Sequence, residues 1–259
     1  MLALSIFRPA TMDLKEESAI GDASRHWYYT AKARAIKSLV GEGGVASLLD
    51  VGAGSGVISR MLVADGFAKR AVCVDPNYED EWIGARRTDR IAFKRSVDAV
   101  EAPLVLMIDV IEHVDDDRGL IAEYAALAAP GTRFVISAPA FESLRSSHDE
   151  FLEHRRRYTV AGLKAVVSAA GLEVADARYF FALVFPAVAA LRLADRAFKG
   201  DKPATASALK AAPRWLNSAL VAIHDFERAA IFPNNRLAGV TAFCLAEKPF
   251  REARRPASN

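Results

Sequence analysis

The chain has 259 residues, of which 52% are hydrophobic and 25% are charged. This length and apolar content predict one large domain with a sizeable core and some appendages. The formal net charge of +2 argues against a nucleic-acid partner, because proteins that follow phosphate backbones carry a marked basic excess.

Cysteine usage and the first residues bear on the compartment. Cys73 and Cys244 fall in apolar, strand-like runs, and neither has a His or Cys nearby at metal-ligand spacing. We expect buried, reduced thiols in a cytoplasmic protein, and no metal site. The first eight residues lack the basic start and long apolar core of a secretory signal. The apolar run within 179–198 is interrupted by Pro186, so it is too short to span a bilayer but leaves a peripheral membrane contact open.

The chain then reads as alternating helices and strands. Residues 24–40 carry helical periodicity, with Trp27, Ala31 and Leu39 on one face, and predict a lid helix that the glycines of 41–44 end. Apolar runs alternate with further helical stretches at a rhythm typical of a doubly wound α/β sheet. The expected strands span 47–51, 72–75, 91–93, 103–109, 134–137, 173–180 and 240–246.

The segment before the last strand is unusually long. About sixty residues separate the last two expected strands, far more than a hairpin needs, and they predict a helical insertion that covers a pocket. The chain therefore divides into a lid region, a cofactor-binding core, the insertion, and the last strand with a basic tail. Their predicted bounds are 1–40, 41–180, 181–239 and 240–259.

The most informative motif is Asp50-Val51-Gly52-Ala53-Gly54-Ser55-Gly56, which follows the first strand and opens the next helix. Glycine has no Cβ and tolerates positive φ, so this turn can place bare main-chain amides against a nucleotide-like ligand. Asp75 ends the second strand roughly 20 residues further on, where Rossmann-type sites hold ribose hydroxyls. Together the two features predict a nucleoside-binding site.

Four passages carry a resemblance to a known family. They are the glycine motif, Val74-Asp75, the run Ile108-Asp109-Val110-Ile111-Glu112-His113-Val114, and the stretch 147–159 with Ser147-His148-Asp149 and His154-Arg155-Arg156-Arg157. In these passages the chain resembles the class I S-adenosylmethionine-dependent methyltransferases, and among them it is similar to the ubiquinone-biosynthesis O-methyltransferases. The resemblance covers residues 24 to 180 well.

The resemblance implies S-adenosylmethionine as the cofactor and a Rossmann-like, seven-stranded sheet whose last strand, 240–246, is antiparallel. It also implies adenine contacts after the third strand, although the acidic residue that the family often has there is replaced by Lys94-Arg95-Ser96. Trp27 in the lid suits the sulfonium cation through its aromatic face. The implied cofactor-binding residues are Asp50, Gly52, Ala53, Gly54, Gly56, Asp75, Ser96, Val97, Asp109 and Trp27.

Methyl transfer to oxygen also needs a base, and histidine titrates in the right range. The candidates are His148, which we favour because it follows the fifth strand, and His154. Glu112 and His113 are equally open to contacting substrate or to a structural role. Arg155 and Arg156 suit either an anionic acceptor group or a solvated surface.

The sequence thus predicts an O-methyltransferase acting on a small-molecule or lipid-linked acceptor, of undetermined oligomeric state. Two other classes stay open at this point. A catalytically silent cofactor-binding partner subunit would keep the glycine turn and Asp75. An NAD-dependent oxidoreductase would share both features, but its third glycine normally comes one residue later.

Overall fold

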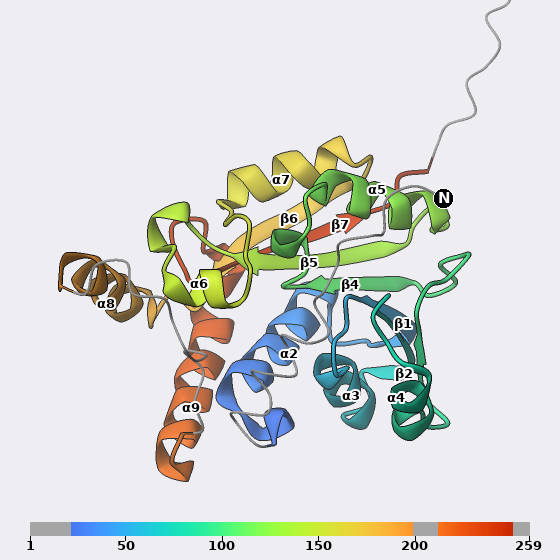
Figure 1. The fold of residues 1–259 in the computed structure, drawn as a ribbon, viewed down its shortest axis with the longest axis horizontal. Helices are drawn as coiled ribbons and strands as arrows, with labels where there is room; N and C mark the ends of the chain where they lie inside the picture. The colour runs from blue at the N-terminus through green and yellow to red at the C-terminus, as the bar shows by residue number, and fades with distance from the viewer. Residues whose placement is uncertain (1–21, 199–211, 251–259) are drawn as a thin grey trace, which may run out of the picture.

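The structure is a computed structural model that describes residues 22–198 and 212–250. The first residues, part of the stretch before the last strand and the basic tail with Arg251, Arg254 and Arg255 lie outside the described residues. Figure 1 shows a central sheet with helices against both of its faces and further helices at one end of the strands.

The sheet has seven strands in the order β3-β2-β1-β4-β5-β7-β6, and β7 runs antiparallel to both of its neighbours. This confirms the predicted Rossmann-like sheet with an antiparallel last strand. The strands are β1 (Val45–Val51), β2 (Ala68–Val74), β3 (Ile91–Lys94), β4 (Leu104–Ile108), β5 (Arg133–Pro139), β6 (Glu173–Phe180) and β7 (Thr241–Glu247).

Helices cover the two faces of the sheet in separate layers. In Figure 1, α2 (Trp27–Val40), α3 (Val57–Ala64) and α4 (Asp80–Arg86) lie on one side, and α5 (Asp117–Leu127) and α7 (Val160–Ala169) on the other. At one end of the strands lie α6 (Ser147–Phe151), α8 (Phe185–Phe198) and α9 (Arg214–Ala230). Short 3-10 turns η1 (Ala23–Arg25), η2 (Ile111–His113), η3 (Glu142–Leu144) and η4 (Phe232–Asn234) complete the described elements.

Strand β4 shows why the sheet is buried on both faces. Successive side chains of a strand point to opposite faces, so Leu104 and Leu106 join the core layer under α2 and α3. Val105 and Met107 join the layer under α5 and α7, and all four are fully buried. A continuous apolar run is the sequence pattern that such a doubly covered strand requires.

Several smaller predictions can be compared with the structure. Cys73 on β2 and Cys244 on β7 are buried and free, as expected. The lid helix begins at Trp27, because His26 is its N-cap, while Asp22 caps the preceding turn η1. The division into four segments stays a prediction.

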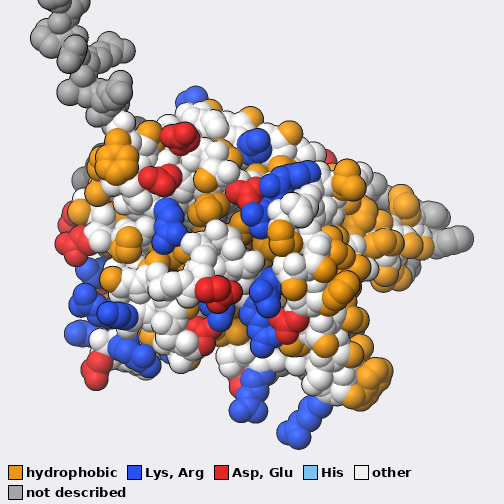
Figure 2. All heavy atoms as spheres, turned by 180° about the vertical axis from the view of Figure 1, so that it is seen from behind, with side chains coloured by type: hydrophobic (Ala, Val, Ile, Leu, Met, Phe, Trp, Pro, Cys, Tyr) orange, Lys and Arg blue, Asp and Glu red, His pale blue; other side chains and the backbone are white. Residues whose placement is uncertain are grey.

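Helices α8 and α9 carry exposed apolar side chains. Leu191 and Leu193 on α8 and Trp215 and Phe226 on α9 are all more than half exposed. Figure 2 shows hydrophobic side chains gathered at the end of the molecule that these helices form. In the described part of the chain, no helix combines the length and apolar character needed to cross a bilayer.

A substitution in the glycine turn tests its close packing. Gly52 has φ +66°, and a Cβ there would lie 2.7 Å from Cγ1 of Val110, so Gly52→Ala forces both strain and a clash. We expect it to lower the free energy of unfolding by about 2 kcal/mol. Gly43→Ala is the matched control, because a Cβ at Gly43 meets nothing within 4 Å. Urea denaturation measures both, and equal midpoints would contradict the prediction.

Candidate active site

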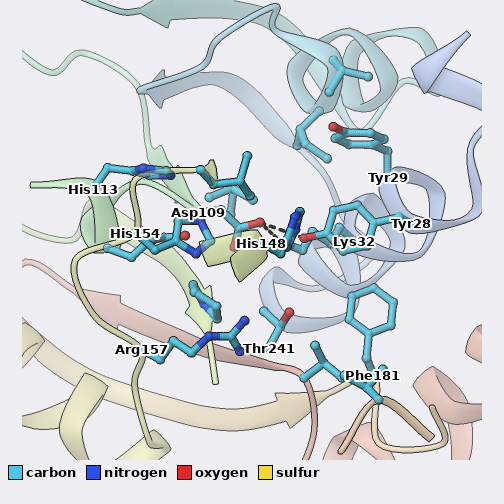
Figure 3. A pocket seen from close by; sticks show the side chains of 18 of the residues that line it. Tyr28, Tyr29, Lys32, Asp109, His113, His148, His154, Arg157, Phe181 and Thr241 are labelled. Carbon is cyan, nitrogen blue, oxygen red and sulfur yellow. Dashed lines mark hydrogen bonds and ion pairs between the residues drawn. The ribbon is translucent and has the colours of Figure 1, made fainter. Parts of the chain in front are cut away.

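A cavity of about 520 Å³ opens at the carboxyl ends of β1 and β4. Open α/β sheets bind their ligands at this edge. Its wall combines residues from the glycine turn, the lid helix α2, the segment around α6, and α8 (Figure 3). It brings together seven of the predicted site residues, namely Trp27, Asp50, Gly52, Ala53, Asp109, His148 and His154.

The glycine turn adopts the conformation that its sequence predicts. Gly52, Gly54 and Gly56 all have positive φ, and Gly56 in the left-handed region is the N-cap of α3. Asp50 is buried just before the turn and accepts a hydrogen bond of 2.6 Å from the Ser59 hydroxyl of α3. Burial raises the pKa of Asp50 to about 7, against the opposing effect of that hydrogen bond.

Asp75 lies outside the cavity wall, but it keeps an acceptor available. One carboxylate oxygen accepts hydrogen bonds from the backbone and side chain of Asn77 at 2.9 and 3.0 Å. The other oxygen, Oδ2, is buried with no hydrogen-bond partner among the described residues. Burial raises the pKa of Asp75, although hydrogen bonds from Asn77 and Gly54 oppose it. An unsatisfied buried oxygen is costly, and a ribose hydroxyl is the donor that would satisfy it. The residues therefore fit a nucleoside.

Ser96 and Val97, the predicted adenine contacts, do not line this cavity. They line a separate cavity of about 690 Å³, together with residues of β1, β2 and β3. Nearer the glycine turn, Tyr78 donates a hydrogen bond of 2.7 Å to the Gly54 carbonyl and stacks on Trp82. The roles of Ser96 and Val97, and of Gly54 and Gly56, stay predictions.

A buried ion pair joins the lid to the sheet. Lys32 of α2 is 1% exposed and its ammonium contacts Asp109, which follows β4. The carboxylate also accepts 3.0 Å hydrogen bonds from the hydroxyls of Tyr28 and Ser137. Burial alone would raise the pKa of Asp109, but Lys32 and these donors outweigh it and lower the pKa. Figure 3 shows Lys32 and Tyr28 converging on Asp109 at one side of the cavity.

Aromatic rings hold the start of the lid helix against α9. Trp27 stacks on His224 with ring centroids 5.3 Å apart, and its backbone N–H donates to Asn217 at 2.8 Å. Tyr28 stacks on Phe181 at 5.4 Å. The start of α2 therefore contacts both α9 and the segment before α8 at the cavity wall.

Three histidines, His113, His148 and His154, also line the cavity, and Figure 3 shows His113 and His154 on the side away from Tyr28. His148 lies on α6, and burial, with Arg192 and His154 nearby, lowers its pKa to about 4. His154 follows α6, and its Nδ1 lies 2.8 Å from Asp149. Arg157 donates to the same carboxylate at 2.7 and 3.1 Å. His148 is thus neutral at pH 7 and can accept a proton.

Arg155 and Arg156 both make contacts with the turn after β4. Arg155 donates to the backbone carbonyl of His113 at 2.9 Å and pairs with Asp115. Arg156 donates to the carbonyl of Asp115 at 2.8 Å and lies 3.2 Å from Asp117. These contacts tie the segment after α6 to the turn after β4, which favours the structural interpretation of both arginines.

Sequence reasoning missed Lys32 and the hydroxyl of Tyr28. A signal was present, because Lys32 shares the apolar stripe of the lid helix with Ala35, Ile36 and Leu39, all of them buried. A charged residue on such a stripe needs a buried partner.

A family model described as a methyltransferase domain matches residues 24–177. The chain belongs to this family. With the strand order of the sheet, it is a class I S-adenosylmethionine-dependent methyltransferase, and S-adenosylmethionine is its cofactor. The oxidoreductase alternative is therefore wrong. No curated protein sequence matches the chain significantly.

Solved structures share the fold at low sequence identity. A structure of the complex between the Haloferax volcanii Trm112 methyltransferase activator and a proposed methyltransferase is 20% identical, with a TM-score of 0.57, covering 95% of this chain and 100% of that one. Haemonchus contortus phosphoethanolamine N-methyltransferase 2 is 14% identical, with a TM-score of 0.55 and coverages of 94% and 59%. Human N-acetylserotonin methyltransferase is 12% identical, with a TM-score of 0.51 and coverages of 93% and 55%.

Removing the buried cation tests the link between lid and sheet. Lys32→Met leaves the Asp109 carboxylate partly buried without its charge partner, so we expect a loss of roughly 3 kcal/mol in the free energy of unfolding. Lys37→Met is the matched control on the same helix, because the Lys37–Asp65 pair is more exposed and worth under about 1 kcal/mol. Denaturant titration compares them, and similar losses would argue against a special role for Lys32.

The raised pKa of Asp50 predicts a pH effect on stability. Folded Asp50 holds its proton to about pH 7, whereas the ordinary pKa is 3.8, so the protein loses stability as pH rises between these values. Asp50→Asn cannot ionise. We expect its free energy of unfolding, relative to the unsubstituted protein, to rise by about 2 kcal/mol from pH 5 to pH 8. Urea titrations at both pH values measure this, and a constant difference would show that Asp50 titrates normally.

Proposed function

We propose that this methyltransferase methylates an oxygen of a small-molecule or lipid-linked acceptor, with His148 as the base. The observation that carries the proposal is that one cavity holds both halves of such a site. Residues of the glycine turn form one part of its wall, and a neutral histidine and apolar side chains of α8 form another.

The donor half is built by the glycine turn and the lid. S-adenosylmethionine supplies a methyl carbon that is activated by a positively charged sulfur. Gly52 and Ala53 line the cavity, and Asp75 Oδ2 suits a ribose hydroxyl. The rings of Trp27 and Tyr28 also line the cavity, where aromatic faces favour a sulfonium cation. These residues position the donor, which is most of what an in-line displacement requires.

The acceptor half contains the proton acceptor. His148 is neutral at pH 7, so the acceptor oxygen can lose its proton to the imidazole and take the methyl group, while the electrons of the C–S bond stay on sulfur. Because a pKa of about 4 makes His148 a weak base, this step benefits from any group that acidifies the acceptor hydroxyl.

The wall that α8 contributes supports this acceptor class. Val184, just before α8, and Val188 and Leu191 on the helix line the cavity. Leu191 is also 66% exposed and is followed by the exposed Leu193, so apolar surface continues from the cavity to the outside. An acceptor with an apolar tail would bury that tail along α8. The same surface supports a peripheral contact with lipid.

Replacement of the base tests the proposal. With labelled S-adenosylmethionine and a phenol that carries an alkyl chain, we expect His148→Ala to lower kcat by about 100-fold or more, because it removes proton transfer. Its affinity for S-adenosylhomocysteine, measured by calorimetry, should stay nearly unchanged. Glu150→Ala is the matched control, because Glu150 is exposed on the same helix and does not line the cavity.

Two outcomes would contradict the proposal. Unchanged kcat in His148→Ala would remove the base assignment. Tight binding of S-adenosylhomocysteine with no transfer to alcohols, phenols or lipid extracts would instead support the catalytically silent subunit that the sequence left open.

A further inference from the structure

We propose that Glu112, His113 and His154 bind one divalent transition-metal ion at the wall of the cavity. One ligand atom from each residue can be chosen so that all three lie within 4.8 Å of one another. They come from two segments far apart in sequence, the turn η2 after β4 and the loop after α6. The sequence predicted no metal site because of its cysteines, and this cluster uses none.

The backbone holds the two segments together. The N–H of Arg155 donates to the carbonyl of Glu112 at 2.8 Å, and the N–H of His154 donates to the carbonyl of Asp149 at the same distance. The guanidinium of Arg155 adds its hydrogen bond to the carbonyl of His113. These contacts fix the loop after α6 against η2, so the cluster is part of the fold rather than a chance approach of side chains.

His154 is oriented as a metal-ligating histidine is. Its Nδ1 contacts the buried Asp149 carboxylate, which Arg157 and the capping box of α6 hold in place. A carboxylate accepts hydrogen bonds, so the nitrogen that faces Asp149 is the donor and Nε2 is the nitrogen left for a metal ion. A carboxylate behind the imidazole is the usual support of a histidine ligand.

His113 has the complementary arrangement. Its ring is hydrogen-bonded to the backbone of Leu152, while its Nδ1 is buried with no hydrogen-bond partner among the described residues. The rings of His113 and His154 lie 4.8 Å apart at 73°. Figure 3 shows both histidines on the same side of the cavity. A metal ion could bind at Nδ1, because imidazole nitrogen is a good ligand for first-row metals.

Glu112 supplies the negative charge. Its carboxylate is fully buried. Two imidazoles and one carboxylate form a donor set typical of zinc, iron(II) and related ions, and they leave further coordination positions open. His113 and His154 line the cavity, so the open positions would face it.

If the enzyme methylates oxygen as proposed, the metal ion would assist that reaction. An acceptor hydroxyl that coordinates the ion becomes more acidic, as water does on zinc. This would compensate for the weak basicity of His148.

Metal titration tests the site without any need for turnover. The tag-free full-length protein is treated with a chelator and then titrated with Zn²⁺ in a calorimeter, where we expect one saturable site. Glu112→Gln and His154→Gln should weaken binding more than Asp149→Asn does, and Asp149→Asn, which removes only the support behind His154, should weaken it by about 10- to 100-fold. The matched control Glu150→Ala should bind Zn²⁺ as the unsubstituted protein does, because Glu150 is exposed and does not line the cavity.

A second measurement reports the ligands directly. Co²⁺ in place of Zn²⁺ should give visible absorption bands that His154→Gln abolishes, while circular dichroism and affinity for S-adenosylhomocysteine show that the variant is folded. Absence of saturable Zn²⁺ binding, or equal binding by all variants, would overturn the site. Metal binding without methyl transfer would support the metal site and contradict the proposed function. Methyl transfer by a protein that binds no metal would contradict the metal site and leave the proposed function unaffected.

Discussion

The buried pair between Lys32 and Asp109 is the constraint on which the cavity depends. A lysine that is 1% exposed is tolerated only because a carboxylate meets it, and that carboxylate follows the central strand β4. The pair fixes the distance between the lid helix and the edge of the sheet where the glycine turn lies. It also neutralises Asp109, which leaves Asp50 and Glu112 as the other buried carboxyl groups that line the cavity.

Local features of the chain were predictable because their physical causes are local. The apolar run of β4 required a strand covered on both faces, and the structure places it so. The three glycines of the turn required positive φ, and all three have it. Seven of the twelve predicted site residues line one cavity because the carboxyl ends of adjacent parallel strands meet at one edge.

Features that depend on distant partners were not predictable. Lys32 and Asp109 are 77 positions apart, and neither local sequence indicates which residue is the partner of the other. Arg155 and Arg156 look alike in sequence whether they face an anion or the fold, and only their contacts with the turn after β4 decide between the two. The short helices α4 and α6 span too few residues for periodicity to reveal. His113 and His154 come together only because the loop after α6 returns to η2.

The buried Glu227 of α9 holds the start of α8 in place. Its carboxylate accepts hydrogen bonds from the backbone N–H groups of Ala182 and Leu183, immediately before α8, and also contacts His224. The root of α8 is therefore anchored independently of the glycine turn, which is anchored to β2 and α3. If α8 holds the acceptor as proposed, substitutions of its cavity-lining residues can retune acceptor selectivity in evolution or engineering, while recognition of the methyl donor is inherited unchanged.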